Sequence, residues 1–88
     1  MNIYPSREFS RAFRKITKKR PSIKEKIKLK IALISLNPLH PSLKLHKLKG
    51  KQSDNWSIAV EQDLRLIFTY VPDGILLIDI GKHEEVYQ

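Results

Sequence analysis

The spacing of apolar residues changes character once along this chain, at residues 37–41, and that change limits the folds open to it. Before this point apolar residues recur every three or four positions, which is typical of helices with one face in a core. After it they alternate with polar residues or form short runs, which is typical of strands. A helical half followed by a strand-rich half favours an α+β fold in which two helices cover one face of a sheet.

Pro21 divides the helical half into two predicted helices, because proline disfavours helical backbone at the residue before it. Ser6 is placed to cap the first helix and Ser22 to cap the second. The first helix carries one apolar stripe of Phe9, Ala12, Phe13 and Ile16. The second carries a main stripe of Ile23, Ile27, Ile31 and Ile34 and a further stripe of Leu29, Leu33 and Leu36. Two stripes on one helix predict contacts with two layers, or with one layer and a partner protein.

Five segments carry the signals of strands. They are residues 1–4, 43–49, 56–61, 64–71 and 75–80. The last is almost continuously apolar, which predicts a central strand buried on both faces. It follows a strong turn signal at residues 72–74, where Pro presets φ and Gly permits a positive φ. We therefore expect residues 1–88 to form a single α+β domain with a short N-terminal strand, a two-helix hairpin and a twisted antiparallel sheet of about four strands.

Charge is distributed unevenly along the chain, whose formal net charge is +8. Residues 1–51 hold 15 Lys and Arg against two Glu, whereas residues 52–88 hold two basic residues against seven acids. The first segment is therefore +13 and the second −5. Such an asymmetry orients a domain on a polyanion, and RNA is the polyanion we expect. The alternative interpretation is a solvated basic face on two surface helices.

The sequence gives no support to several kinds of site. Without cysteine the chain has no disulfide and no thiolate metal site, which fits a reducing compartment. Its longest apolar runs, such as residues 31–34 and 75–78, are far too short to span a bilayer. No phosphate-binding glycine loop, HExxH or GxSxG motif occurs. We expect a cytoplasmic protein that uses no metal, no small-molecule cofactor and no membrane contact.

Three stretches carry side chains suited to cleaving a phosphodiester. They are residues 45–50 with His46, residues 63–68 with Asp63 and Arg65, and residues 79–87 with His83 and Tyr87. Because these stretches lie at strand ends or on neighbouring strands, they can converge in space. A base can then take the proton of a ribose 2′-OH, an acid can protonate the leaving 5′-oxygen, and a cation can hold the charge on the phosphorane. Histidine has the unperturbed pKa that suits this proton transfer near neutral pH.

The run LHKLKG, followed by NWSIAVEQDLRLIFTY and then by IDIGKHEEVY, resembles the RelE/ParE toxin superfamily, especially its YafQ-like and RelE-like messenger RNA interferases. The order of a leading strand, a helical hairpin and a sheet is similar too, and the resemblance covers essentially the whole chain. It implies the toxin of a type II toxin–antitoxin system, an endoribonuclease that cleaves messenger RNA on the ribosome without a metal. It also implies a cognate antitoxin protein as partner and a 2′,3′-cyclic phosphate as product.

The resemblance assigns roles to particular residues. His46 lies where YafQ-like toxins carry a catalytic histidine, Asp63 matches their catalytic aspartate, and His83 matches their C-terminal catalytic histidine. Arg65 resembles the arginine of a RelE-like strand and would hold the scissile phosphate. Tyr87 resembles a late functional tyrosine and would orient the nucleotide. We expect His83 to be the general acid or base, with His46 and Asp63 assisting.

The chain departs from the YafQ-like pattern at Ala59, where those toxins carry another histidine, so it mixes features of two subfamilies. Seven cations are expected to contact RNA, namely Arg7, Arg11, Arg14, Lys18, Lys47, Lys49 and Lys82. Two other functions stay open, a ParE-like inhibitor of DNA gyrase and an inactive homologue that only binds an antitoxin. The residues also have structural interpretations: Arg65 as an ion-pair partner of a nearby carboxylate, and Asp63 as a turn residue.

Overall fold

Seven helices and strands follow one another along residues 1–82, which together with Val86 are the residues that this computed structural model describes. They are β1 (Asn2–Pro5), α1 (Arg7–Lys19), α2 (Ile23–Leu36), β2 (His46–Lys47), β3 (Trp56–Ala59), β4 (Leu64–Val71) and β5 (Gly74–Lys82). Short 3-10 turns at Pro41–Leu43 and Gly50–Gln52 flank β2. The α+β class and the order of the elements confirm the sequence-based prediction.

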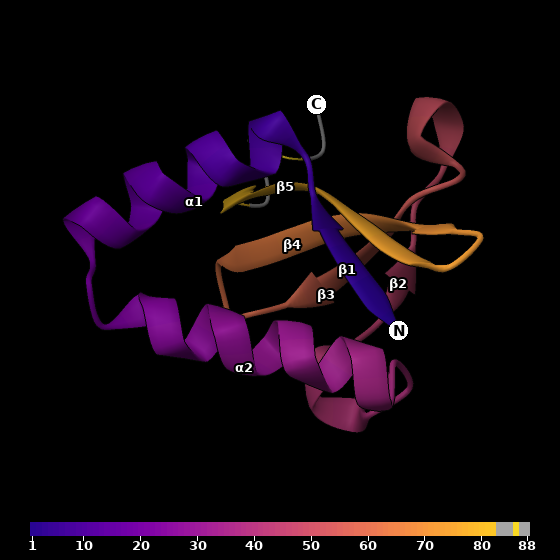
Figure 1. The fold of residues 1–88 in the computed structure, drawn as a ribbon, viewed down its shortest axis with the longest axis horizontal. Coiled ribbons are helices and arrows are strands. Elements are labelled where there is room, and N and C mark those ends of the chain that lie inside the picture. Colours follow the sequence, from indigo (N-terminus) through magenta and orange to yellow (C-terminus); the bar gives the residue numbers. More distant parts are fainter. Residues whose placement is uncertain (83–85, 87–88) are drawn as a thin grey trace.

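The five strands in the described residues form one sheet in the order β1-β5-β4-β3-β2 (Figure 1). Strands β2 to β5 pair antiparallel, as predicted. Strand β1 joins the far edge parallel to β5, with Asn2 opposite Gly74, so the sheet is mixed and not purely antiparallel. Strand β1 pairs on the side of β5 that β4 leaves free. The Tyr4 hydroxyl donates to Asp73 at 2.5 Å, and this hydrogen bond raises the pKa of the Tyr4 phenol and lowers that of the Asp73 carboxyl.

Helix α1 begins where the sequence predicts. The Ser6 hydroxyl accepts from the Phe9 backbone N–H at 3.0 Å, which caps the helix, and it donates to the Ile78 carbonyl at 3.0 Å. The second bond ties the start of α1 to β5. The helix ends at Lys19, as expected from the proline that follows.

The prediction that Ser22 caps α2 is wrong. Ser22 has helical backbone angles, and its side chain makes no capping hydrogen bond. A tight turn caps α2 instead. The backbone N–H groups of Ile23 and Lys24 donate to the carbonyls of Arg20 and Pro21 at 3.0 and 3.3 Å, respectively. The main stripe of α2 is buried except for Ile31, which is half-buried.

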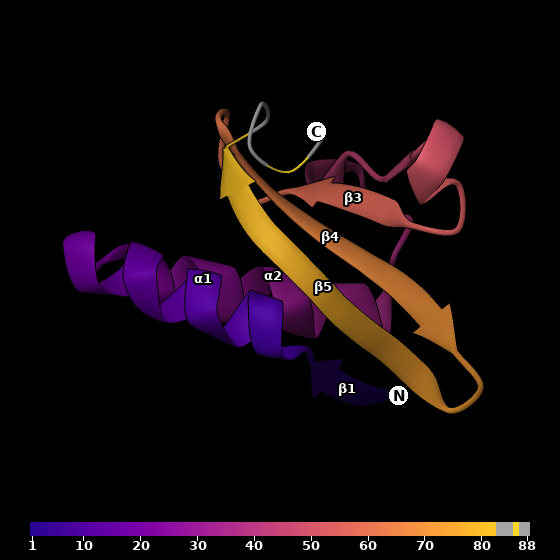
Figure 2. The same cartoon turned by 90° about the horizontal axis from the view of Figure 1, so that it is seen from above.

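The main core lies between the helices and one face of the sheet. Figure 2 shows both helices on the same side of the sheet. Phe9 of α1 and Ile27 of α2 pack there against apolar side chains of β3, β4 and β5, such as Ile58, Leu66 and Leu77. The further stripe of α2 does not form a second buried layer, since Leu29 is 67% and Leu36 83% exposed.

The predicted strand at 43–49 shrinks to the two residues of β2. Leu43 ends a 3-10 turn and is fully buried, and Lys44 follows with a left-handed backbone, φ 49° and ψ 53°. A strand cannot run through such a residue, so β2 starts only at His46. By contrast, β5 extends the predicted strand at both ends.

Candidate functional site

The face of the sheet turned away from the helices carries the candidate site. Ile58 and Leu66 belong to the core beneath the helices, so Ser57 and Arg65 face the opposite way, because side chains alternate along a strand. His46 of β2 is paired with Ser57 of β3, which puts both side chains on this face. The structure therefore brings His46, Ser57 and Arg65 to one face from three adjacent strands.

Arg65 is held by a hydroxyl and a main-chain carbonyl. Its Nη2 atom donates to Ser57 Oγ at 2.9 Å and lies 3.4 Å from the carbonyl oxygen of Lys44. Ser57 is fully buried and Arg65 is half-buried, so the bond between them is partly shielded from water. A hydrogen bond from a charged donor in such surroundings is stronger than one at the surface.

Sequence reasoning does not single out Ser57. Its only signal is a small polar residue between Trp56 and Ile58, and a polar residue at every second position is ordinary in a strand with one wet face. The role of Ser57 becomes visible only when the register places it beside His46 and hydrogen-bonds it to Arg65.

Two other predicted site residues are exposed. His46 is exposed in β2, the short edge strand. Asp63 is exposed in the bend that joins β3 to β4, two positions before Arg65. The structure therefore places Asp63 at the end of the sheet, whereas His46 shares the face with Arg65.

The C-terminal part of the predicted site is only partly described. Gly81 of β5 is paired with Arg65, and Lys82 is the last residue of that strand. His83 directly follows Lys82 in the sequence. Both His83 and Tyr87 lie outside the described residues, so their predicted roles stay predictions.

Comparison with known families accounts for this fold. Residues 1–88 match the family model described as the bacterial toxin of type II toxin–antitoxin systems, YafQ. The chain belongs to the YafQ toxin family. This confirms the resemblance seen in the sequence. A search of curated proteins gives no match.

Solved structures of related toxins have the same fold as this YafQ-family chain. YafQ from E. coli strain BL21(DE3) superposes with a TM-score of 0.84 at 25% identity, over 99% of this chain and 98% of that one. YafQ in the E. coli DinJ–YafQ complex gives a TM-score of 0.81 at 25% identity, over 99% and 98% of the two chains. A YoeB/ParE toxin from Agrobacterium tumefaciens, at 18% identity, shares the fold with a TM-score of 0.81 over 94% of this chain and 99% of that one.

The seven basic residues that are expected to contact RNA lie on several elements of this YafQ-family chain. Arg7, Arg11, Arg14 and Lys18 are exposed on the side of α1 away from the core, and Lys49 and Lys82 are exposed elsewhere. Lys47 is paired with Trp56, and its Nζ lies 4.7 Å above the centre of the indole ring. Because neighbouring residues of a strand face opposite ways, Lys47 lies on the other face of the sheet from His46.

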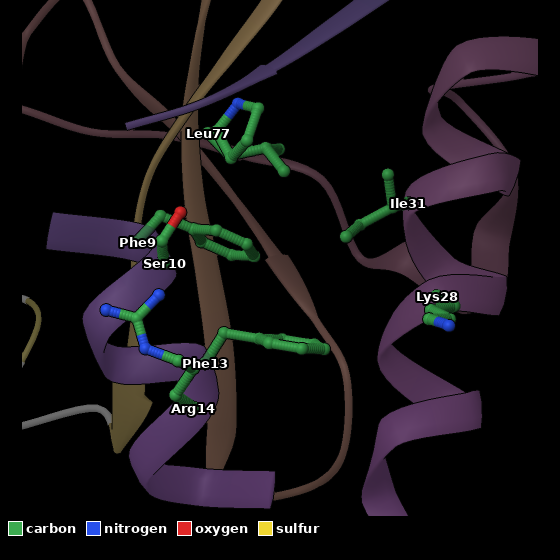
Figure 3. Close-up of a pocket in the computed structure, with 8 residues that line it drawn as sticks. Phe9, Ser10, Phe13, Arg14, Lys28, Ile31 and Leu77 are labelled. Atoms are coloured by element: carbon green, nitrogen blue, oxygen red, sulfur yellow. The ribbon is translucent and has the colours of Figure 1, made fainter. Parts of the chain in front are cut away.

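A groove of about 340 Å³ opens between the two helices. Phe9 and Phe13 of α1 face Ile31 of α2 across it, as Figure 3 shows, while Arg14 and Lys28 also line it. The groove thus combines an apolar floor with a cation on each helix. It lies on the helix side of the sheet, away from Arg65.

An exposed ion-pair cluster lies at the bend that contains Asp63. Glu61 accepts from Arg20 Nη2 at 3.0 and 3.2 Å, and its carboxylate lies 3.5 Å from Lys26 Nζ. The Arg20 hydrogen bond is the main reason that the pKa of Glu61 lies below its usual value, with Lys26 contributing less. The cluster joins the end of α1 and the first turns of α2 to the bend between β3 and β4.

The described residues, 1–82 and Val86, contain no group of three or more His, Asp or Glu side chains placed to hold a metal ion. Neither α1 nor α2, in that same part of the chain, is long and apolar enough to cross a membrane.

Proposed function

We propose that this YafQ-family toxin is an endoribonuclease that cleaves messenger RNA on the ribosome, by attack of a ribose 2′-OH and without a metal. The observation that carries the proposal is the anchored guanidinium of Arg65 on the face of the sheet away from the helices, the face that also carries His46 of β2. A fixed planar cation suits the developing charge on a phosphorane, because preorganised groups need no rearrangement in the transition state.

The proposed reaction needs side chains that transfer protons and a cation that binds the phosphate. A base removes the proton from the 2′-OH, whose oxygen then bonds to phosphorus while the bond from phosphorus to the 5′-oxygen breaks. An acid gives a proton to that 5′-oxygen, which leaves a 2′,3′-cyclic phosphate and a 5′-OH. We assign the main proton transfer to His83, assistance to His46 and Asp63, and the phosphate to Arg65. Tyr87 orients the nucleotide.

The basic residues serve docking in this proposal. Exposed Arg and Lys on the outer side of α1 contact the ribosomal RNA backbone and give an affinity that falls steeply with salt. They lie on a different element from Arg65, so docking and chemistry are separable by substitution. The reaction takes place in the cytoplasm, where the ribosomes are.

We further propose that a cognate antitoxin neutralises this chain, as DinJ is found in complex with E. coli YafQ. The groove between α1 and α2 is the docking surface that supports this. Its apolar floor fits the apolar face of a helix, and Arg14 and Lys28 favour acidic residues beside that face. A second copy of this +8 chain would bring like charges together, so charge favours an acidic partner.

Expression of the chain without an antitoxin tests the proposed function. We expect growth arrest, with new 5′ ends in cellular messenger RNA that are lost in Arg65→Ala. The exposed cation Lys15 is a matched control, and Lys15→Ala should keep the new 5′ ends. Intact messenger RNA combined with a loss of DNA supercoiling would instead support gyrase inhibition and overturn the nuclease proposal.

A further inference from the structure

We propose that Ser57 is a positioning residue, which sets the plane of the Arg65 guanidinium before any RNA arrives. The inference rests on the proposed function, in which Arg65 holds the scissile phosphate. It adds a residue that neither the sequence motifs nor the family resemblance indicates. The main-chain carbonyl of Lys44 gives the same nitrogen of Arg65 a second, longer contact.

The buried hydroxyl of Ser57 needs a hydrogen-bond partner. Ser57 is fully buried, although it sits on the face of the sheet that carries exposed His46 and half-buried Arg65. A hydroxyl that is removed from water without a hydrogen bond is costly to bury. Here its oxygen accepts from the charged Nη2 of Arg65 at 2.9 Å, which gives the buried hydroxyl the hydrogen bond that it needs.

The backbone at Lys44 brings a carbonyl oxygen close to Arg65. Lys44 is the one non-glycine residue with a positive φ in residues 1–82, and such a conformation is costly for a side chain with a Cβ. It ends the Pro41–Leu43 turn, and it leaves the Lys44 carbonyl oxygen 3.4 Å from Arg65 Nη2. This contact is longer than the one to Ser57, so we assign the carbonyl the smaller contribution to holding the guanidinium in place.

Because the guanidinium group of arginine is rigid, holding one of its nitrogens restricts the orientation of the whole group. The guanidinium is planar and delocalised, with five N–H bonds in a rigid fork. Holding Nη2 on a hydroxyl therefore limits rotation of the plane. A phosphate that reaches Arg65 meets a cation already aligned, so less of the binding energy is spent on ordering the site.

Cleavage kinetics on a ribosome-bound message test this role. We expect Ser57→Ala to lower kcat by about 10- to 100-fold while KM changes by less than about 3-fold, because orientation and not encounter is lost. Ser57→Thr keeps the hydroxyl and should recover most of kcat. In an Arg65→Ala background, Ser57→Ala should add less than about 2-fold, since both changes act through one contact.

Thr69 provides a matched control for the loss of a hydroxyl. It lies on β4, on the same face as Arg65, and its hydroxyl donates to the Asp54 carbonyl at 2.8 Å. Thr69→Val removes that hydrogen bond but leaves the contacts of Arg65 with Ser57 and Lys44 in place, so it should leave kcat unchanged. Thermal unfolding of every variant separates a change of orientation from a loss of fold.

The guanidinium itself gives a readout that does not need cleavage. In NMR spectra of the wild-type protein, we expect slow rotation of the Arg65 guanidinium, which becomes fast in Ser57→Ala and stays slow in Ser57→Thr. Equal rotation rates in wild type and Ser57→Ala would overturn the inference. So would a loss of kcat from Ser57→Ala that is as large in the Arg65→Ala background as in the wild type. A wild-type protein that cleaves no RNA refutes the proposed function, whereas the rotation rates decide the positioning role.

Discussion

Neutralising the outer stripe of α1 should weaken docking on RNA without affecting chemistry. The stripe consists of Arg7, Arg11, Arg14 and Lys18, which are all exposed and follow one another on the side of the helix away from the core. They extend over about 16 Å of helix, at 1.5 Å per residue. We consider the variant in which all four are replaced by Gln, which has nearly the helix propensity of Arg and Lys.

The size of the effect follows from counterion release. Each lost phosphate contact lowers the slope of log affinity against log salt concentration by about 0.7 for single-stranded and about 0.9 for duplex nucleic acid, so four contacts contribute roughly 3. Between about 50 and 200 mM salt, a slope difference of 3 corresponds to a roughly 60-fold difference in the loss of affinity. The wild type should therefore weaken far more over this range than the variant.

Binding to purified ribosomes, measured by fluorescence at a series of salt concentrations, provides the slopes. The matched control replaces Lys15, Lys19, Lys24 and Lys30, four cations outside the stripe, so that the net charge falls by the same amount. An unchanged slope in the stripe variant, or an equal change in the control, would refute docking through this stripe and leave a solvated basic face as the explanation.

Three further predictions concern chemistry, pH and the sheet. His83→Ala should abolish cleavage, and Arg65→Lys should keep RNA binding but lose most turnover, which single-turnover assays on ribosome-bound messages will check. The lowered folded-state pKa of Glu61 means that its stabilisation is present above the unfolded value of about 4.3 and is lost as pH falls through the folded value. Glu61→Gln should therefore flatten the fall of Tm between about pH 5 and 3, and a wild-type-like fall would contradict this reasoning. Gly74→Ala should detach β1 from β5 and lower Tm, because a Cβ at this position would collide with the backbone carbonyl of Asn2. Amide hydrogen exchange in β1 that is the same as in the wild type would contradict this prediction.

Sequence periodicity was sufficient to predict the helices and the faces of the longer strands. Pro21 separates α1 from α2 as predicted, and the alternation along β4 correctly separates buried Leu66 from half-buried Arg65. These features are local, because a helix face or a strand face repeats within a few residues. The existence of β1 was likewise predicted from four residues.

Features that depend on distant partners could not be predicted. Nothing in β1 specifies that it pairs parallel with a strand at the other end of the chain. Lysine gives no signal for a left-handed backbone, so the early end of the strand predicted at 43–49 was missed at Lys44. Ser57 acquires its role only from the register of β2, β3 and β4. His83 and Tyr87 remain predictions carried by the family resemblance.

The parallel pairing of β1 with β5 has a consequence for the synthesis of this toxin. The hydrogen bond between Ser6 and Ile78 joins residues 72 positions apart, and β5 supplies the strand between β1 and β4. A nascent chain can form its helices early, but it cannot close the sheet until residues 74–82 have left the ribosomal exit tunnel. Strand β1 and both helices therefore leave the ribosome well before the strand that joins them to the rest of the sheet, and the fold is completed only after β5 has emerged.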